Sequence, residues 1–272
     1  MSPEVDFAVS IVRPDSPQLF LLFPGNADVM TIDPLEFIRT TGIGSRNIVI
    51  FRDPFRSFFH EGFSGEYRGM DGIVRWQKER LADRFPHVRE VFCVGTSSGC
   101  GATIHSAYQL KARAAWSFGG RYPRPGALQE SDRYRSELFL KTIGRESPVT
   151  MTPEELRLIT RAVGQPEAQE KVMQLTENPD TILDWDWLRR MAGEIRGTPG
   201  GTDFHFYYAR TNDVDRCFAE GFQGCPGVAL HPVIPPWGDR PPRPGSFNKP
   251  DHLIVPILKQ TGELPSVFAS YL

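Results

Sequence analysis

The chain has 272 residues, which is enough for one large α/β domain with a substantial core or for two small domains. Its hydrophobic content of 40%, charged content of 24% and net charge of −2 give no electrostatic reason to expect nucleic acid or an anionic membrane as a partner. The N-terminal residues lack the basic segment and apolar core of a secretory signal, and no apolar run approaches the roughly 18 residues that cross a bilayer. We therefore expect a cytoplasmic protein with no membrane partner.

Apolar runs typical of strands alternate with helical patterns through the first 120 residues. The strand patterns cover residues 7–12, 19–23, 47–51, 91–94 and 114–118. Apolar residues at helical spacing lie between them, at 32–38, at 73–85 and from Cys100 towards Leu110. This alternation predicts an α/β fold with a mostly parallel, doubly wound sheet, in which ligands bind beyond the carboxyl ends of the strands.

The strand patterns stop between Arg121 and about Gly200. Within this segment, residues 152–155 form a capping box with proline at the first helical position. Residues 180–195 have the apolar spacing of an amphipathic helix. We therefore predict a helical insertion over this segment.

Strand patterns return in the last third of the chain, at 204–209 and at 228–233. The proline-rich stretch that follows, 235–242, is typical of a long ordered loop. Residues 251–264 predict a short C-terminal helix that is interrupted or begins near Pro256.

The most informative motif is Gly95-Thr96-Ser97-Ser98-Gly99. It follows the strand pattern at 91–94 and precedes three small residues that begin a helix. A serine at the centre of G-x-S-x-G between a strand and a helix sits on a strained turn, where the glycines allow close backbone approach and the hydroxyl is exposed at the strand end. We therefore predict Ser97 as a nucleophile.

An active serine needs a histidine base, and usually a carboxylate that orients the base. Among the six histidines, only His252 follows the final strand pattern in a loop, where a base can reach the same sheet edge as Ser97. The other histidines lie in predicted strands, inside the helix after the turn or far from that edge: His60, His87, His105, His205 and His231. We predict His252 as the base.

Two carboxylates follow the strand pattern at 204–209 and emerge at the same edge of the sheet. Asp213 is closer to the strand end and is the predicted acid. Asp215 is the alternative acid, although it is also placed to cap a helix over 216–220.

Acyl transfer passes through an oxyanion that needs preorganised N–H donors. The backbone N–H of Ser98, directly after the nucleophile, is the first predicted donor. The second is expected from the loop after 19–23, where Asn26 or Ala27 carries an N–H; Pro24 has none, and Gly25 allows the loop to pass close to Ser97.

The cysteines do not suggest a metal or redox site. Cys93, Cys100, Cys217 and Cys225 show no C-x-x-C spacing and no nearby pair of histidines. We expect structural thiols, no metal and no cofactor.

The order of nucleophile, acid and base, with an oxyanion loop ahead of the nucleophile, resembles the α/β-hydrolase superfamily over almost the whole chain. The resemblance implies a mostly parallel sheet and a Ser-His-Asp mechanism through an acyl-enzyme. It also implies that residues 121–200 are a helical cap, and that residues 1–120 and 201–272 are the two parts of the hydrolase core.

Aromatic residues near this edge and in the predicted cap are candidates for lining an acyl or aromatic pocket: Trp116, Tyr122, Trp187 and Trp237. We predict a serine hydrolase of carboxylesterase or thioesterase type, acting on a small-molecule or carrier-bound acyl substrate. The alternatives are an acyltransferase or cyclase that uses the same triad, and a non-catalytic ligand-binding protein of the same fold.

Overall fold

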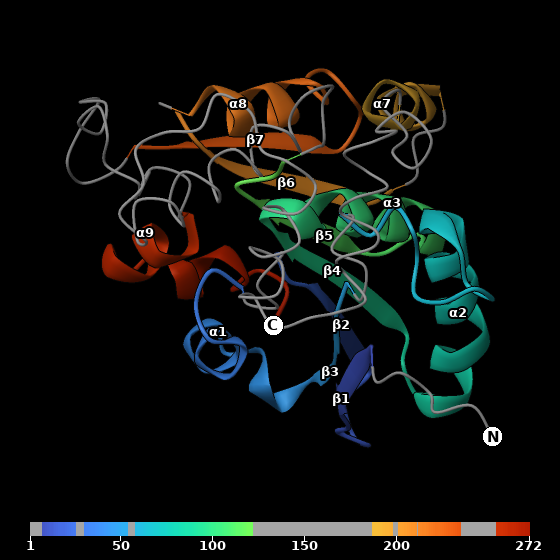
Figure 1. The fold of residues 1–272 in the computed structure, drawn as a ribbon. Coiled ribbons are helices and arrows are strands. Elements are labelled where there is room, and N and C mark those ends of the chain that lie inside the picture. The colour runs from blue at the N-terminus through green and yellow to red at the C-terminus, as the bar shows by residue number, and fades with distance from the viewer. Residues whose placement is uncertain are drawn as a thin grey trace, which may run out of the picture.

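The structure, a computed structural model, describes residues 7–25, 30–53, 58–121, 187–197, 201–210, 212–234 and 254–272. These residues contain a seven-stranded sheet in the order β1-β3-β2-β4-β5-β6-β7 (Figure 1). The strands are β1 (Ala8–Ile11), β2 (Gln18–Phe23), β3 (Asn47–Phe51), β4 (Glu90–Thr96), β5 (Ala114–Phe118), β6 (Asp203–Ala209) and β7 (Val228–Val233). All neighbouring strands are parallel except β1 and β3, so the predicted mostly parallel α/β sheet is confirmed.

Helices cover both faces of this sheet. They are α1 (Pro34–Thr41), α2 (Gly69–Arg84), α3 (Cys100–Leu110), α7 (Trp187–Gly197), α8 (Asp213–Glu220) and α9 (Ile254–Gln260), with short 3-10 turns η1 (Ile43–Ser45), η2 (Ser97–Gly99) and η5 (Leu264–Val267). The ends of α1 show why it forms where it does: the Asp33 carboxylate accepts hydrogen bonds from two backbone N–H groups of the first turn, and Gly42 ends the helix with a left-handed φ of 78°.

The helices form two layers, each with its own core (Figure 1). On one face, α2, α3, α7 and α8 pack on the sheet through a core that includes Phe23, Phe51 and Phe206. On the other face, α1, α9 and η5 pack through a core that includes Phe20, Trp116 and Phe268. Successive side chains along the buried strands point to opposite faces of the sheet, so each strand contributes apolar side chains to both cores.

Helix α7 packs with the helices of the main sheet layer. It falls inside the segment 121–200, yet Trp187, Met191 and Ile195 are buried in the same core as α2 and α3. At this end of the segment, the apolar residues of α7 therefore share the core of α2 and α3. Residues 122–186, including the predicted capping box, lie outside the described residues.

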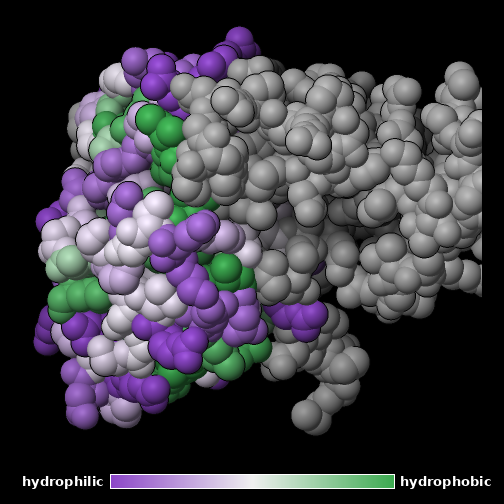
Figure 2. Space-filling view, turned by 90° about the vertical axis from the view of Figure 1, so that its left-hand side faces the viewer, coloured by the Kyte–Doolittle hydropathy of each residue, from purple (hydrophilic) through white to green (hydrophobic). Residues whose placement is uncertain are grey.

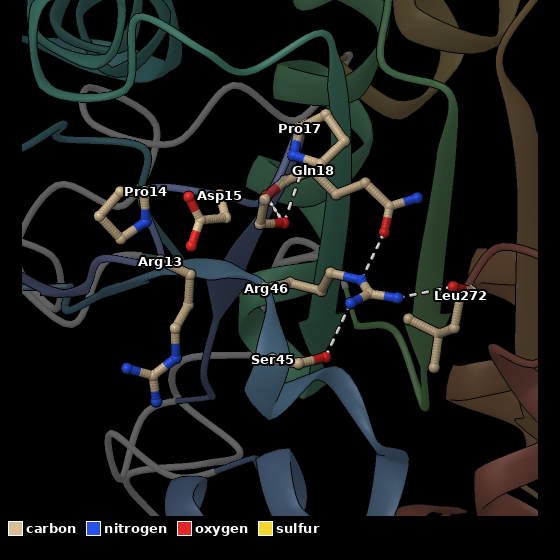
Figure 3. A pocket seen from close by; sticks show the side chains of 9 residues that line it. Arg13, Pro14, Asp15, Pro17, Gln18, Ser45, Arg46 and Leu272 are labelled. Carbon is tan, nitrogen blue, oxygen red and sulfur yellow. Dashed lines mark hydrogen bonds between the residues drawn. The ribbon is translucent and has the colours of Figure 1, made fainter.

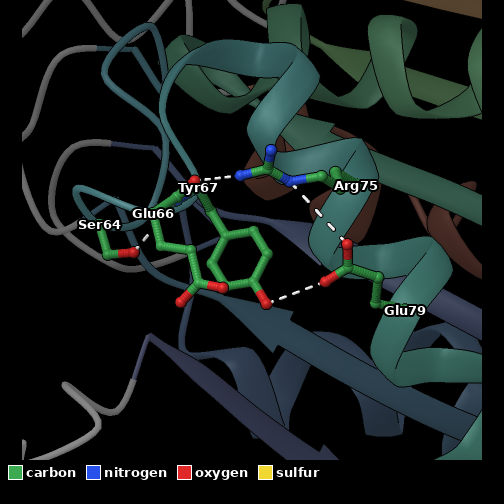
Figure 4. Close-up of polar contacts among 5 residues, drawn as sticks. All are labelled: Ser64, Glu66, Tyr67, Arg75 and Glu79. Carbon is green, nitrogen blue, oxygen red and sulfur yellow. Dashed lines mark hydrogen bonds and ion pairs between the residues drawn. The ribbon is translucent and has the colours of Figure 1, made fainter.

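The segment before α2 is tied to that helix by polar contacts (Figure 4). The Tyr67 hydroxyl donates to Glu79 Oε2 at 2.9 Å, and this hydrogen bond raises the pKa of Tyr67 above its usual 10.0. Arg75 lies over the Tyr67 ring at 5.2 Å, pairs with Glu79 at 3.9 Å and donates to the Glu66 carbonyl. These contacts fix the chain that leads into α2.

The face that carries α1 and α9 is mainly hydrophilic where the structure describes it, with small separate hydrophobic patches (Figure 2). Among the described residues, none of the helices combines the length and the apolar character that crossing a membrane requires.

Candidate active site

Ser97 lies directly after β4, in the turn η2 that leads into α3. Its φ of 51° is in the left-handed region, which a non-glycine residue adopts only at a cost of about 1–2 kcal/mol. The buried strand before it and the small residues of α3 after it produce the strand, turn and helix that the motif predicts. Ser97 is half-buried, whereas Ser98 beside it is only 3% exposed.

Neither glycine of the motif can be replaced by a residue with a side chain without a clash. A Cβ at Gly99 would lie 2.1 Å from the Phe23 carbonyl oxygen, and a Cβ at Gly95 would lie 2.0 Å from Thr103 Oγ1. Thr103 uses that hydroxyl to donate to the Gly99 carbonyl at 2.9 Å. The end of β2, the turn and the start of α3 therefore meet with backbone against backbone.

The loop after β2 passes next to Ser97. A Cβ at Gly25 would lie 3.1 Å from Ser97 Cβ and 3.7 Å from Ser97 Oγ. The absence of a side chain at Gly25 thus leaves the hydroxyl uncrowded on this side. The predicted oxyanion donors Asn26 and Ala27 follow immediately and lie outside the described residues.

The two candidate acids lie at the start of α8, which follows β6. Asp213 is the first residue of α8, and its side chain lies outside the described part of the structure. Asp215 is fully buried, and its Oδ1 accepts from Arg121 Nε at 3.3 Å. The prediction that Asp215 caps a helix over 216–220 is wrong: the helix begins at Asp213, and the cap is Asn212, whose Oδ1 accepts from the Asp215 N–H at 3.2 Å.

Arg121 joins the turn η2 to helix α8. Its backbone N–H donates to the Ser97 carbonyl at 3.2 Å, while its guanidinium pairs with Asp215. No sequence pattern indicated this pairing, because the two residues are 94 positions apart. The location of Arg121 directly after β5 is the one signal that could have suggested the pairing, since β5 lies between β4 and β6 in the sheet.

A thiol lies close behind the turn. Cys100 is completely buried and donates to the Phe118 carbonyl at 3.7 Å. Burial raises the pKa of Cys100 to about 12, so the group stays protonated and is a poor nucleophile at neutral pH. Ser97 is therefore more accessible than Ser98 or Cys100 in this turn.

Several predicted site residues fall elsewhere. The predicted base His252 and the aromatic candidates Tyr122 and Trp237 lie outside the described residues. Trp116 is fully buried on the α1 and α9 side, where its ring centroid lies 4.7 Å from that of Phe268, and Trp187, the first residue of α7, is 5% exposed. Both tryptophans therefore belong to the hydrophobic core, Trp116 on one face of the sheet and Trp187 on the other.

Three further histidines occupy other parts of the fold. His105 on α3 contacts Asp71 Oδ1 at 2.9 Å, and burial lowers its pKa below 6.5. His205 and His231 lie within β6 and β7, in agreement with their predicted strand positions. In the described ranges, no group of three or more histidine, cysteine or acidic side chains is arranged to hold a metal ion.

A hollow of about 500 Å³ lies at the amino ends of β2 and β3, far along the strands from the Ser97 edge (Figure 3). Arg46 occupies one wall and donates to Gln18 Oε1 at 2.7 Å and to the Leu272 backbone oxygen at 2.6 Å. Ligands of open α/β sheets bind at the carboxyl ends of the strands, so the Ser97 edge is the better candidate for the active site.

Comparisons with known proteins agree with this topology. No protein-family model matches the chain, and no curated protein matches it in sequence. Similar solved structures include a carboxylesterase from the ammonia-oxidizing thaumarchaeon Nitrososphaera gargenis, with a TM-score of 0.58 and 14% identity over 97% of this chain and 93% of that chain. A lipase-esterase related protein from Clostridium acetobutylicum gives a TM-score of 0.50 and 12% identity over 96% of this chain and 98% of that chain. Strand order and overall likeness together show that the chain has the α/β-hydrolase fold.

Proposed function

We propose that this chain is a serine hydrolase that cleaves an ester or thioester through an acyl-enzyme on Ser97. The observation that carries the proposal is the left-handed turn at Ser97, which sits between β4 and α3 with the backbone of Gly25 alongside. Strain at a serine in such a turn costs stability and persists where function requires it. The similarity of the fold to a carboxylesterase supports ester chemistry.

In the proposed reaction, His252 removes the Ser97 proton as Ser97 Oγ attacks the acyl carbon. The Ser98 N–H and an N–H from Asn26 or Ala27 stabilise the oxyanion. His252 then protonates the leaving group. In the second half of the reaction, water attacks the acyl-enzyme with His252 as the base, and His252 returns the proton to Ser97 Oγ as the acid leaves.

The acid that orients His252 is proposed to be Asp213. Asp215 already shares an ion pair with Arg121, which supports a structural role for that carboxylate. Asp215 remains the alternative acid, since it is buried under the same edge of the sheet. Asp213→Asn and Asp215→Asn separate the two roles: loss of turnover with an unchanged free energy of unfolding identifies the acid.

Labelling with a fluorophosphonate probe, followed by peptide mapping, tests the nucleophile. We expect stoichiometric labelling of the wild type at Ser97, and its loss in Ser97→Ala and His252→Ala. Ser98→Ala is the matched control, because it removes the neighbouring hydroxyl but keeps the backbone N–H that is proposed to bind the oxyanion. This control should still be labelled.

Absence of labelling in folded wild-type protein would contradict an activated serine and favour the non-catalytic binding protein. Labelling at a serine other than Ser97 would contradict the turn assignment. If Ser97 is labelled, product analysis with an acyl donor in water, with and without added alcohol or amine, distinguishes hydrolysis from acyl transfer.

A further inference from the structure

A cavity of about 710 Å³ lies between the β6–β7 end of the sheet and the segment formed by α9 and η5. Its volume falls within the range of small-molecule sites. Ser97 does not line it; the lining includes His205, Tyr207, His231, Thr261, Glu263 and Ser266. Among the described residues, the lining therefore does not include the proposed nucleophile.

A chain of hydrogen bonds along one wall determines which polar atoms are acceptors. Asp203 Oδ2 pairs with Arg113 at 3.1 Å and lies 3.2 Å from the Tyr271 hydroxyl. A carboxylate in an ion pair only accepts, so the Tyr271 O–H donates to it. His205 Nε2, at 3.0 Å from the same hydroxyl oxygen, must then be the donor in that contact.

The same reasoning extends to the second histidine. With its proton on Nε2, neutral His205 accepts at Nδ1, which lies 3.2 Å from His231 Nε2. His231 therefore donates through Nε2 and keeps an unprotonated Nδ1 lone pair, on a residue that lines the cavity. Burial lowers the pKa of both histidines below 6.5, so neither contributes a positive charge at neutral pH.

Two hydroxyls on the opposite wall are also acceptors. The Thr261 hydroxyl donates to the Leu258 carbonyl at 3.2 Å, and the Ser266 hydroxyl donates to the Glu263 carbonyl at 2.6 Å. Each has its proton engaged and offers oxygen lone pairs to a ligand. Glu263 is the single charged side chain among the described residues that line the cavity.

Aromatic and aliphatic surface completes the site. The rings of Tyr207 and His231 stack with centroids 4.3 Å apart and an interplanar angle of 10°. A cation near a phenol ring is attracted by its π-electrons, and the aliphatic side chains of α9 and β7 can cover an apolar body. The lining is thus rich in acceptors, carries one negative charge and has apolar surface beside it.

We propose that this cavity is a second ligand site, which binds a small organic ammonium compound with an apolar or aromatic body. The ammonium group is held by Glu263, by hydroxyl oxygens and by the His231 Nδ1 lone pair. The apolar body lies against the aliphatic residues of β7 and α9. This site does not depend on the chemistry proposed for Ser97.

Titration calorimetry at pH 7.5 with 2-phenylethylammonium as the probe tests the proposal. The neutral 2-phenylethanol and the anionic 3-phenylpropanoate are matched in body and differ in charge. We expect the ammonium compound to bind more tightly than either, and Glu263→Gln to weaken its binding up to about fivefold, as loss of an exposed charge pair does. His231→Phe, which keeps a ring but removes the acceptor, should also weaken it.

Glu220→Gln is the matched control, because Glu220 is an exposed carboxylate on α8 in the opposite helix layer. It should leave binding unchanged, as should Ser97→Ala, so the result does not depend on the hydrolase proposal. Equal binding of the three probes, or an equal effect of Glu263→Gln and Glu220→Gln, would overturn the ammonium site.

Discussion

At the scale of single residues, the proposed nucleophile Ser97 has an unfavourable backbone conformation. Its φ of 51° would suit glycine, yet the position carries a Cβ and a hydroxyl. The conformation is imposed by its surroundings, since Arg121 binds the Ser97 carbonyl and the flanking glycines pack on β2 and Thr103. The turn therefore stores strain that the rest of the fold compensates.

Replacing Ser97 by glycine should release this strain, whereas replacing it by alanine should not. We expect Ser97→Gly to be more stable to unfolding than Ser97→Ala by about 1 kcal/mol, after allowance for the larger entropy of glycine in the unfolded chain. Urea unfolding monitored by tryptophan fluorescence measures the difference. If Ser97→Ala equals or exceeds Ser97→Gly in stability, the turn holds no strain.

The sequence predicts a turn well where the signal is local. Ser97 could be placed because five consecutive residues encode its turn. The burial of Trp116 could not be predicted, because it depends on the packing of α1, α9 and η5 against β5, which no local pattern records. The pairing of Arg121 with Asp215 depends on the order of β4, β5 and β6, which no local pattern records.

At the scale of elements, the start of α3 is held against the end of β2 by direct backbone contact at Gly99. Gly101 lies two residues further along the same chain, but its neighbour is different. A Cβ there would lie 3.3 Å from Met70 Cε, the flexible end of a side chain, and 4.0 Å from the Trp187 ring. The two glycines thus differ in what a methyl group would displace.

We expect Gly99→Ala to destabilise the protein by about 3 kcal/mol, because β2 and α3 must separate to admit the methyl group. Gly101→Ala should be neutral or slightly stabilising, since alanine is the better helix former and Met70 can move. Thermal and urea unfolding of both variants provide the comparison. A similar decrease in the free energy of unfolding of the two variants would show that the contact of Gly99 with β2 does not cause the destabilisation.

Elements with clear local boundaries were predicted closely. The bounds of β5 and β7 agree with their apolar runs, because charged, glycine or proline residues flank them. The start of α8 was missed by three residues, since Asn212 rather than Asp215 supplies the cap. The pairing of β1 with β3 could not be predicted, because the antiparallel partner of β1 is not the next strand along the chain.

At the scale of the whole molecule, buried histidines make stability depend on pH. Burial lowers the pKa of His105, His205 and His231 below 6.5 in the folded state. As the pH falls through about 6.5, these histidines take up protons more readily in the unfolded chain, so the free energy of unfolding decreases. The groups that face His205 are His231, Tyr271 and Asp203.

We expect the free energy of unfolding to fall between about pH 7.5 and pH 5.5, and His205→Gln to reduce that fall. The exposed His87, changed to glutamine, is the control and should leave the pH dependence as it is in the wild type. Urea unfolding at several pH values tests this. An unchanged pH dependence in His205→Gln would rule out a contribution from this buried histidine.

The strand order also governs how the chain reaches this structure. No two adjacent strands of the described sheet are joined by a tight turn; a helix, another strand or both lie between them along the chain. Sheet formation must therefore await encounters between distant segments, which makes folding slow compared with that of a helical bundle. During synthesis, β5 remains an open, apolar edge until residues 203–209 have left the ribosome. An unpaired apolar strand edge can pair with other chains, so β6 protects β5 from mispairing.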